Sequence, residues 1–269
     1  MAESPAGERP RRLVFGEVAE LYHRRRPGYP EALIDQLATW SGADGEAPRA
    51  LEIGAGTGKA TQLLAARGVA VLAIEPSAEM AVVARTATAG LEVEIVLCDF
   101  ERWQPDGRTF PLVFAAQAWH WVNQRTGYAH ARRVLQPGGR LVVFWNRPAW
   151  GASALRSELS DVYRRIVPEL PADGPLHPDN DGDSIDEIHW SQAIAAADGL
   201  ADPEHGVYES SIEHTAHSYV ELLCTNSEIR LLGDRAREAL LDGVRDTIER
   251  HGGRLTMPMI THVSIARAK

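Results

Sequence analysis

The segment "LEIGAGTGKAT", residues 51–61, places three glycines within five positions, between an apolar run and an expected helix. Glycines at this spacing let the backbone turn tightly and approach a ligand closely. A P-loop would require glycine at position 53 and a hydroxyl residue at position 60, where the chain has Ile53 and Ala60. A dinucleotide loop would require glycine at position 59, which is Lys59. An acidic residue followed by G-x-G-x-G therefore remains, and this pattern suits a ligand without phosphate.

Acidic, polar and aromatic residues also follow the next three apolar segments. Glu75 ends "VAVLAIE", 23 residues after Glu52, and could accept hydrogen bonds from two vicinal ribose hydroxyls. Asp99 and Phe100 follow the third segment, where Asp99 could accept from the exocyclic amine of an adenine and Phe100 could line the ring. The fourth segment ends in "AAQAWHWV", which gathers Gln117, Trp119, His120 and Trp121.

These residues fall at the ends of expected strands in an alternating pattern of strands and helices. We expect strands at 50–54, 70–75, 92–98, 111–117 and 139–145, and helices near 59–67, 78–88 and 124–135. Such alternation predicts βαβ units and a parallel sheet. Ligands bind at the carboxyl ends of the strands in such sheets, so the four strand ends predict one binding site.

The flanking regions predict further elements. "FGEVAELYHRR" has helical periodicity, and Pro30 is well placed as the first residue of a helix in "PEALIDQLATW". Near the C-terminus, "GVYESSIEHT" and "GRLTMPMITHVSIARA" predict two strands around the helix "REALLDGVRDTIERHG". The expected organisation is a flexible N-terminus (1–12), a helical cap over the cofactor (13–48), a cofactor-binding core (49–146), a lid or substrate insertion (147–205) and a C-terminal completion of the core sheet (206–269).

Composition excludes several classes of function. The chain has 269 residues, 44% of them hydrophobic, and a formal net charge of −9. This charge disfavours a nucleic-acid partner, because phosphate contacts need clustered cations. No apolar run approaches the ~20 residues that span a bilayer. Cys98 and Cys224 lack a C-x-x-C arrangement, which favours a reducing cytoplasm and no metal cluster. The acidic loop 179–187 departs from a calcium loop at Ser184 and Trp190. Nothing in the sequence indicates an oligomeric state.

The motifs, in their order, resemble the class I S-adenosylmethionine-dependent methyltransferases, in particular the small-molecule group with an "AWHW" element. Over residues 15–147 the matching motifs are "YHRRRPGYP", "LEIGAGTGKAT", "AIEPS", "CDFERW", "AQAWHWV" and "RVLQPGGRLVVFWN". The resemblance implies an α/β fold with a Rossmann-like doubly wound sheet, mostly parallel with an antiparallel C-terminal strand, plus a helical lid insertion. Pro111 departs from the family's usual Asp at a strand start, where proline is tolerated.

The resemblance also implies a cofactor site for S-adenosylmethionine. Glycines of the loop would approach the methionine part, Glu75 would hold the ribose and Asp99 the adenine. Tyr22 and Arg26 would close over the cofactor, with Arg26 as a partner for its carboxylate. The complete set of expected cofactor contacts is Tyr22, Arg26, Glu52, Gly54, Ala55, Gly56, Gly58, Glu75, Pro76, Asp99, Phe100 and Gln117.

A methyltransferase of this kind aligns an acceptor atom and, for a hydroxyl or ammonium, removes a proton. The candidates for that base are Tyr22, His120 and His214, although His120 could instead be structural. Between Arg165 and Arg230 there is no Lys or Arg but there are fourteen acidic residues. If this segment covers the site, it favours a neutral or cationic small-molecule acceptor bearing a reactive O, N or C atom, with secondary metabolism as one candidate setting.

Two alternatives share part of this pattern. A nicotinamide-dependent oxidoreductase would keep the glycine turn and Glu75, but it predicts glycine at position 59 and leaves the Asp99–Phe100 pair unexplained. A non-methylating cofactor-binding protein of the same fold would keep the glycine loop while lacking an acceptor pocket.

Overall fold

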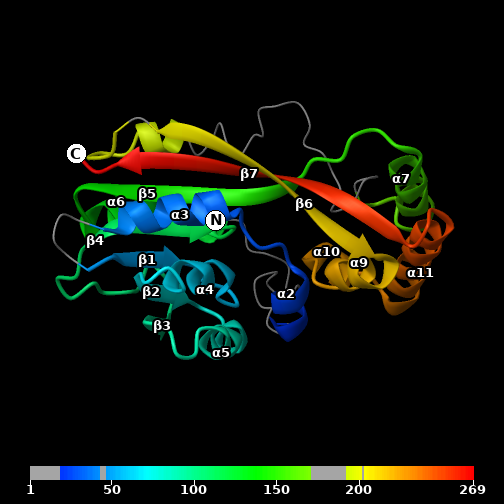
Figure 1. Cartoon of the computed structure of the whole chain (residues 1–269), viewed down its shortest axis with the longest axis horizontal. Helices are drawn as coiled ribbons and strands as arrows, with labels where there is room; N and C mark the ends of the chain where they lie inside the picture. Colours follow the sequence, from blue (N-terminus) through cyan, green and yellow to red (C-terminus); the bar gives the residue numbers. More distant parts are fainter. Residues whose placement is uncertain (1–18, 43–46, 171–191, 202) are drawn as a thin grey trace.

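The computed structural model describes residues 19–42, 47–170, 192–201 and 203–269, and it contains a seven-stranded sheet in the order β3-β2-β1-β4-β5-β7-β6 (Figure 1). The strands are β1 (Arg49–Ile53), β2 (Ala70–Glu75), β3 (Val93–Leu97), β4 (Phe110–Ala116), β5 (Leu135–Pro148), β6 (Glu204–Thr215) and β7 (Arg254–Arg267). The helices are α2 (Ala19–Arg25), α3 (Glu31–Ser41), α4 (Lys59–Ala65), α5 (Ala78–Ala87), the 3-10 helix η2 (Trp119–Trp121), α6 (Gln124–Val134), α7 (Ala154–Ile166), α9 (Ala216–Leu223), α10 (Ser227–Arg230) and α11 (Asp234–Arg250).

The sheet is parallel except at one strand. β1 pairs in parallel with β2 and β4, β2 with β3, and β4 with β5, whereas β7 runs antiparallel to both β5 and β6. The predicted fold class is therefore confirmed. The chain leaves β1 in one direction towards β2 and β3 and later returns to β4 on the other side of β1. This reversal creates a crevice beyond the carboxyl ends of β1 and β4, where open α/β sheets bind ligands.

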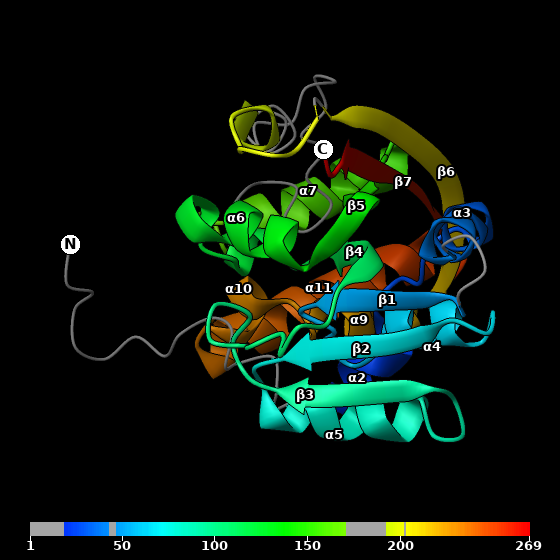
Figure 2. The same cartoon turned by 90° about the vertical axis from the view of Figure 1, so that its left-hand side faces the viewer.

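Helices cover both faces of the central strands, which explains why β4 is buried along its whole length. Leu112 and Phe114 of β4 lie in an apolar cluster with Leu33 and Leu37 of α3. Val113, one position along β4, lies in a second cluster with residues of α6 on the opposite face. Figure 2 shows α3 and α6 on opposite sides of the sheet.

β5, β6 and β7 are the longest strands, and they extend beyond the central sheet (Figure 1). At their far end lie α7, α9, α10 and α11, which we call the helical unit. Its apolar core is separate from the two sheet clusters and contains Leu159 and Tyr163 of α7, Tyr219 of α9, and Leu240 and Val244 of α11. In sequence, α7 belongs to the predicted insertion 147–205 and the other three helices to the segment 206–269, and tertiary packing joins them.

Some predictions concern residues outside the described part of the chain. These are the flexible N-terminus 1–12, the acidic loop 179–187 and most of the insertion beyond residue 170. The predicted strand 139–145 is found within β5, which begins earlier because Leu135 pairs with Phe110 of β4 and ends later because β7 pairs with it as far as Pro148. Among the described residues, every helix is too short or too polar to cross a membrane.

Gly58 fixes the packing of α4 against α5. It precedes α4 in the left-handed region at φ 81°, and a Cβ atom there would lie 3.2 Å from Cα and Cβ of Ala84 in α5. Gly68 has nearly the same φ, 80°, but no heavy atom lies within 4 Å of a Cβ placed there. Both glycines therefore have a left-handed backbone, which favours glycine. Of the two, Gly58 alone also lacks room for a side chain, because Ala84 lies against it.

We predict that Gly58→Ala lowers the free energy of unfolding by roughly 2–4 kcal/mol, the sum of left-handed strain and overpacking. Gly68→Ala, the matched control, should cost only the strain, about 1–2 kcal/mol. Urea denaturation followed by circular dichroism measures both. Equal losses in the two variants would show that the contact with Ala84 does not constrain α5.

Candidate functional site

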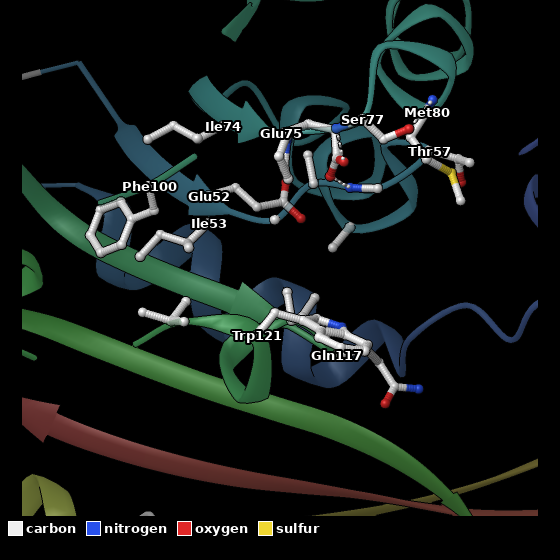
Figure 3. Close-up of a pocket in the computed structure, with 18 of the residues that line it drawn as sticks. Glu52, Ile53, Thr57, Ile74, Glu75, Ser77, Met80, Phe100, Gln117 and Trp121 are labelled. Atoms are coloured by element: carbon white, nitrogen blue, oxygen red, sulfur yellow. Dashed lines mark hydrogen bonds between the residues drawn. The ribbon is translucent and has the colours of Figure 1, made fainter. Parts of the chain in front are cut away.

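A cavity of about 670 Å³ opens at the carboxyl ends of β1, β2 and β4, at the crevice that the strand order defines (Figure 3). Its walls come from five parts of the chain: α2 with the residues after it, the loop after β1, the turn after β2, the segment after β3 and the segment after β4. The predicted site residues that line it are Tyr22, Arg26, Glu52, Gly54, Ala55, Gly56, Glu75, Pro76, Asp99, Phe100, Gln117 and His120.

The loop after β1 is held against its neighbours by its backbone. The amides of Gly54 and Ala55 both donate to the carbonyl of Ile74, at 2.8 and 3.0 Å. Gly54 has φ 72°, and a Cβ atom there would lie only 2.5 Å from Cβ of Ala118 after β4. Gly56 is also left-handed, at φ 57°, but a Cβ there would enter open space. Gly54 is thus required by packing, whereas Gly56 leaves room beside the cavity.

Glu75 connects this loop to the next turn of the chain. Its Oε2 accepts from the amide of Gly56 at 2.7 Å, and its Oε1 accepts from the amide of Ser77 at 2.8 Å. Burial raises the pKa of Glu75, while these two amide hydrogen bonds oppose that rise. A carboxylate has about four acceptor positions, so two amides leave capacity for ligand hydroxyl groups.

Glu52 is a second acidic side chain in the same wall, and it is 1% exposed. The Thr61 hydroxyl donates to its Oε2 at 2.5 Å. Burial raises the pKa of Glu52 to about 8, the Thr61 hydrogen bond lowers it, and the nearby charge of Glu75 raises it further. Glu52 is therefore mostly protonated at neutral pH, whereas Glu75 receives two amide donors. The two acids lie on adjacent strands, and burial raises the pKa of both.

α2 closes one side of the cavity with Tyr22, and Arg26, the residue directly after α2, also lines it. The Arg26 guanidinium lies over the Tyr22 ring, 5.0 Å from its centroid. One turn away, the Nδ1 atom of His23 lies 3.1 Å from the Thr57 hydroxyl in the glycine loop. α2 is thus in direct contact with the loop that it faces.

Asp99 and Phe100 form the wall after β3. Asp99 is half-buried, and its Oδ2 lies 3.8 Å from Nε of Arg102, which is itself 84% exposed. Phe100 is buried, and its ring centroid lies 4.6 Å from that of His130. Phe100 therefore belongs both to the apolar core and to the cavity wall. Figure 3 shows it beside Ile53.

The segment after β4 places polar and aromatic side chains opposite the two acids. Gln117 adopts φ 58°, an uncommon conformation for a residue other than glycine, and such conformations cluster at functional sites. Trp119 is fully buried in the core, but Trp121 is 51% exposed and lies across the cavity from Glu52 and Glu75 (Figure 3). The ring of His120 lies 4.7 Å from that of Trp121.

The structure places two predicted residues outside the cavity lining. Gly58 lies behind the loop against Ala84, where it has a packing role. His214 is 5% exposed at the end of β6, and its ring lies 5.6 Å from the Tyr219 ring in the helical unit. Burial lowers the pKa of His214, and the charge of Arg25 adds to this effect. His214 does not line the cavity and is therefore not in a position to act there as a base.

Sequence reasoning missed several residues of the wall, of which Lys59 is the most informative. It is the first residue of α4, lines the cavity and is half-buried, and burial lowers the pKa of its ammonium group. A cation at a helix N-terminus opposes the helix dipole, so Lys59 is in an unfavourable position unless an anion binds near it. That conflict was visible in the sequence. Thr57, Ser77 and Met80 also line the cavity without a comparable signal.

The described residues contain no group of three or more His, Cys, Asp or Glu side chains arranged to hold a metal ion. The cavity wall combines acids on β1 and β2, a glycine loop after β1, and aromatic side chains after β3 and β4.

Residues 50–139 match the family described as a methyltransferase domain. An uncharacterized methyltransferase from Mycobacterium tuberculosis is 40% identical over 134 residues, which are 50% of this chain and 52% of that protein. The chain therefore spans about half the length of the curated relatives it matches. These matches show similarity to methyltransferase domains, with the family match confined to residues 50–139.

Two solved structures resemble the fold over most of the chain. A protein from Anaeromyxobacter dehalogenans, described provisionally as a type II methyltransferase, has a TM-score of 0.60 at 20% identity and covers 91% of this chain and 97% of its own. Phosphoethanolamine N-methyltransferase 2 from Haemonchus contortus, solved with phosphomonomethylethanolamine and S-adenosylhomocysteine, has a TM-score of 0.50 at 15% identity and covers 95% of this chain and 56% of its own. At these identities both show the fold alone.

We predict that Glu52 makes stability depend on pH. Its folded-state pKa of about 8 lies above its ordinary value of 4.5, so the folded state binds the proton more tightly than the unfolded state. The contribution is fully present below pH 4.5 and is lost as pH rises towards 8. The free energy of unfolding should fall by up to about 1.4 kcal/mol per pH unit within that interval.

Glu52→Gln keeps an acceptor for the Thr61 hydroxyl but removes the titration, so its stability profile should be flatter than that of the wild type between pH 5 and 8. Urea denaturation across this pH range measures the difference. Parallel profiles for the two proteins would show that Glu52 is ionised throughout.

Proposed function

We propose that this protein transfers the methyl group of S-adenosylmethionine to a small-molecule acceptor inside the cavity. One observation carries the proposal: a single cavity joins the glycine loop, the acid at the end of β2, and the polar and aromatic residues after β3 and β4 beneath α2. A dinucleotide oxidoreductase would instead need glycine where Lys59 begins α4.

The chemistry of the walls fits the three parts of this cofactor. Glu75 has acceptor capacity for the ribose hydroxyls, and Asp99 with Phe100 offers an acceptor and an apolar surface for adenine. The methionine part would lie along Gly54–Gly56. Its carboxylate would face Arg26 and Lys59, the two cations of this end of the cavity, and its ammonium group would favour the ionised form of Glu52.

S-Adenosylmethionine would supply a methyl group that its sulfonium already activates. The chain's own residues must then orient the acceptor and, for a hydroxyl or ammonium acceptor, remove its proton. Tyr22 and His120 both line the cavity and are the candidates for holding that proton. The exposed face of Trp121 provides an apolar surface next to His120.

The charges in the cavity wall favour a neutral or cationic acceptor. Its acidic members are Glu52, Glu75, Asp99 and Glu101, and its basic members are Arg26, Lys59 and Arg102. If the cofactor carboxylate occupies Arg26 and Lys59, only the exposed Arg102 remains for an anionic acceptor. None of the described acidic residues between Arg165 and Arg230 lines the cavity, so this inference rests on the wall itself.

Calorimetric titration of the purified protein with S-adenosylmethionine, S-adenosylhomocysteine and NAD tests the cofactor. Incubation with methyl-labelled S-adenosylmethionine and a panel of neutral, cationic and polyanionic small molecules then tests transfer. We expect binding of the first two ligands and label in a neutral or cationic product. Binding of NAD alone would overturn the assignment, and cofactor binding without transfer to any acceptor would favour a non-catalytic binding protein.

We predict that Glu75→Ala weakens binding of S-adenosylmethionine by roughly 2–4 kcal/mol, the scale of losing charge-assisted hydrogen bonds. Glu75→Gln retains one acceptor oxygen and should lose less. Calorimetry gives both dissociation constants, and far-UV circular dichroism checks that the sheet is retained. An unaltered dissociation constant in Glu75→Ala would show that the ribose binds elsewhere.

A further inference from the structure

Two consecutive arginines, the last residue of α2 and the residue after it, attach α2 to the helical unit. Nε of Arg25 donates to Oε2 of Glu221 in α9 at 2.6 Å. Arg26 contacts Thr225, just beyond the end of α9, through two atoms: its Nε donates to the Thr225 hydroxyl at 2.9 Å, and its Nη2 donates to the Thr225 carbonyl at 3.0 Å. Arg26 thus lines the cavity while being anchored from outside it.

Thr225 is built to act as an acceptor for that guanidinium. It is fully buried, with 0% exposure, although threonine is usually at the surface. Its hydroxyl donates its single hydrogen to the carbonyl of Leu222 at 2.6 Å. The oxygen is therefore left to accept, and it accepts from Arg26. Two acceptors on one residue fix both the position and the plane of a guanidinium.

We propose that Thr225 is a positioning residue for cofactor binding, which it promotes by holding the Arg26 side chain at the cavity wall. The inference rests on the proposed function and adds a residue that does not line the cavity. A free arginine side chain loses substantial rotamer entropy when it binds an anion. Thr225 fixes Arg26 before the ligand arrives, so less of that cost falls on binding.

The same contacts make the cofactor site dependent on the helical unit. Thr225 follows α9, whose Tyr219 and Val220 are buried in the core of that unit. α2 has seven residues and only Ala19 is buried, so its own apolar contacts are few. Its placement over the glycine loop therefore relies on polar contacts, with Thr225 and Glu221 on one side and Thr57 on the other.

The test compares Thr225→Val, which keeps the shape and removes the hydroxyl acceptor, with Thr225→Ser, which keeps it. We expect Thr225→Val to raise the dissociation constant for S-adenosylmethionine about 3- to 10-fold and Thr225→Ser to stay within about 2-fold of the wild type. In an Arg26→Ala background, the Val substitution should have no further effect. In turnover assays, KM for the cofactor should rise while kcat changes little.

Thr247→Val is the matched control. Thr247 is 1% exposed in α11, donates its hydroxyl hydrogen to Gly243 at 2.8 Å and accepts from Nη2 of Arg250 at 3.1 Å, but it does not line the cavity. It repeats the arrangement around Thr225 within the same helical unit. We expect a loss of stability with an unaltered cofactor dissociation constant, which separates positioning from general weakening of the unit.

Several results would overturn the inference. They are an unaltered dissociation constant in Thr225→Val, an equal loss in Thr225→Ser, and a loss that persists in the Arg26→Ala background. If Thr225→Val does not fold, Thr225→Ala in the same cycle gives the same decision. Failure of the wild type to bind S-adenosylmethionine would instead overturn the proposed function, so the two failures are distinguishable.

Discussion

The carboxylate of Glu75 is the interaction on which the geometry of the site depends. It joins the amide of Gly56, in the loop after β1, to the amide of Ser77, at the start of α5. Two turns that are separate in sequence thereby share one acceptor. The loop also hydrogen-bonds to Ile74 and abuts Ala118, so its path is determined by β2 and β4 as well as by its own glycines. The remaining walls of the cavity surround this loop and the turn that Glu75 joins to it.

Glu52 shows how the same end of the sheet accommodates a second acid. Two ionised carboxylates on adjacent buried strands would repel each other in a medium of low dielectric. Glu52 avoids this cost by remaining mostly protonated, with the Thr61 hydroxyl as its neighbour. A cationic group that binds near Glu52 would favour its ionised form. Without such a group, burying Glu75 beside a mostly protonated Glu52 costs less free energy than burying two ionised carboxylates.

Sequence reasoning predicted best the positions that follow from local order along the chain. The glycine loop follows β1, Glu75 is the last residue of β2, and Asp99 and Phe100 come shortly after β3, so the parallel sheet brings them to one edge. His214 was misplaced because nothing local distinguishes a buried histidine beside Tyr219 from one in a pocket. The helical unit was divided between two predicted segments, because its core joins α7 to helices that begin only at Ala216. The contact between Arg26 and Thr225, 199 residues apart, leaves no trace in either local sequence.

The long strands of the sheet determine how the molecule can open. β5 and β7 remain paired without interruption from Arg140 and Arg267 to Pro148 and Met259, and β6 follows β7 along its whole length to Thr215. The helical unit therefore lies at the end of a stiff three-stranded arm formed by β5, β6 and β7. Moving the unit like a hinged lid would break several backbone hydrogen bonds between these strands. α2, a short helix held mainly by side-chain contacts, is the cheaper element to displace. Exchange of ligands should thus proceed past this helix, with the arm as the fixed frame.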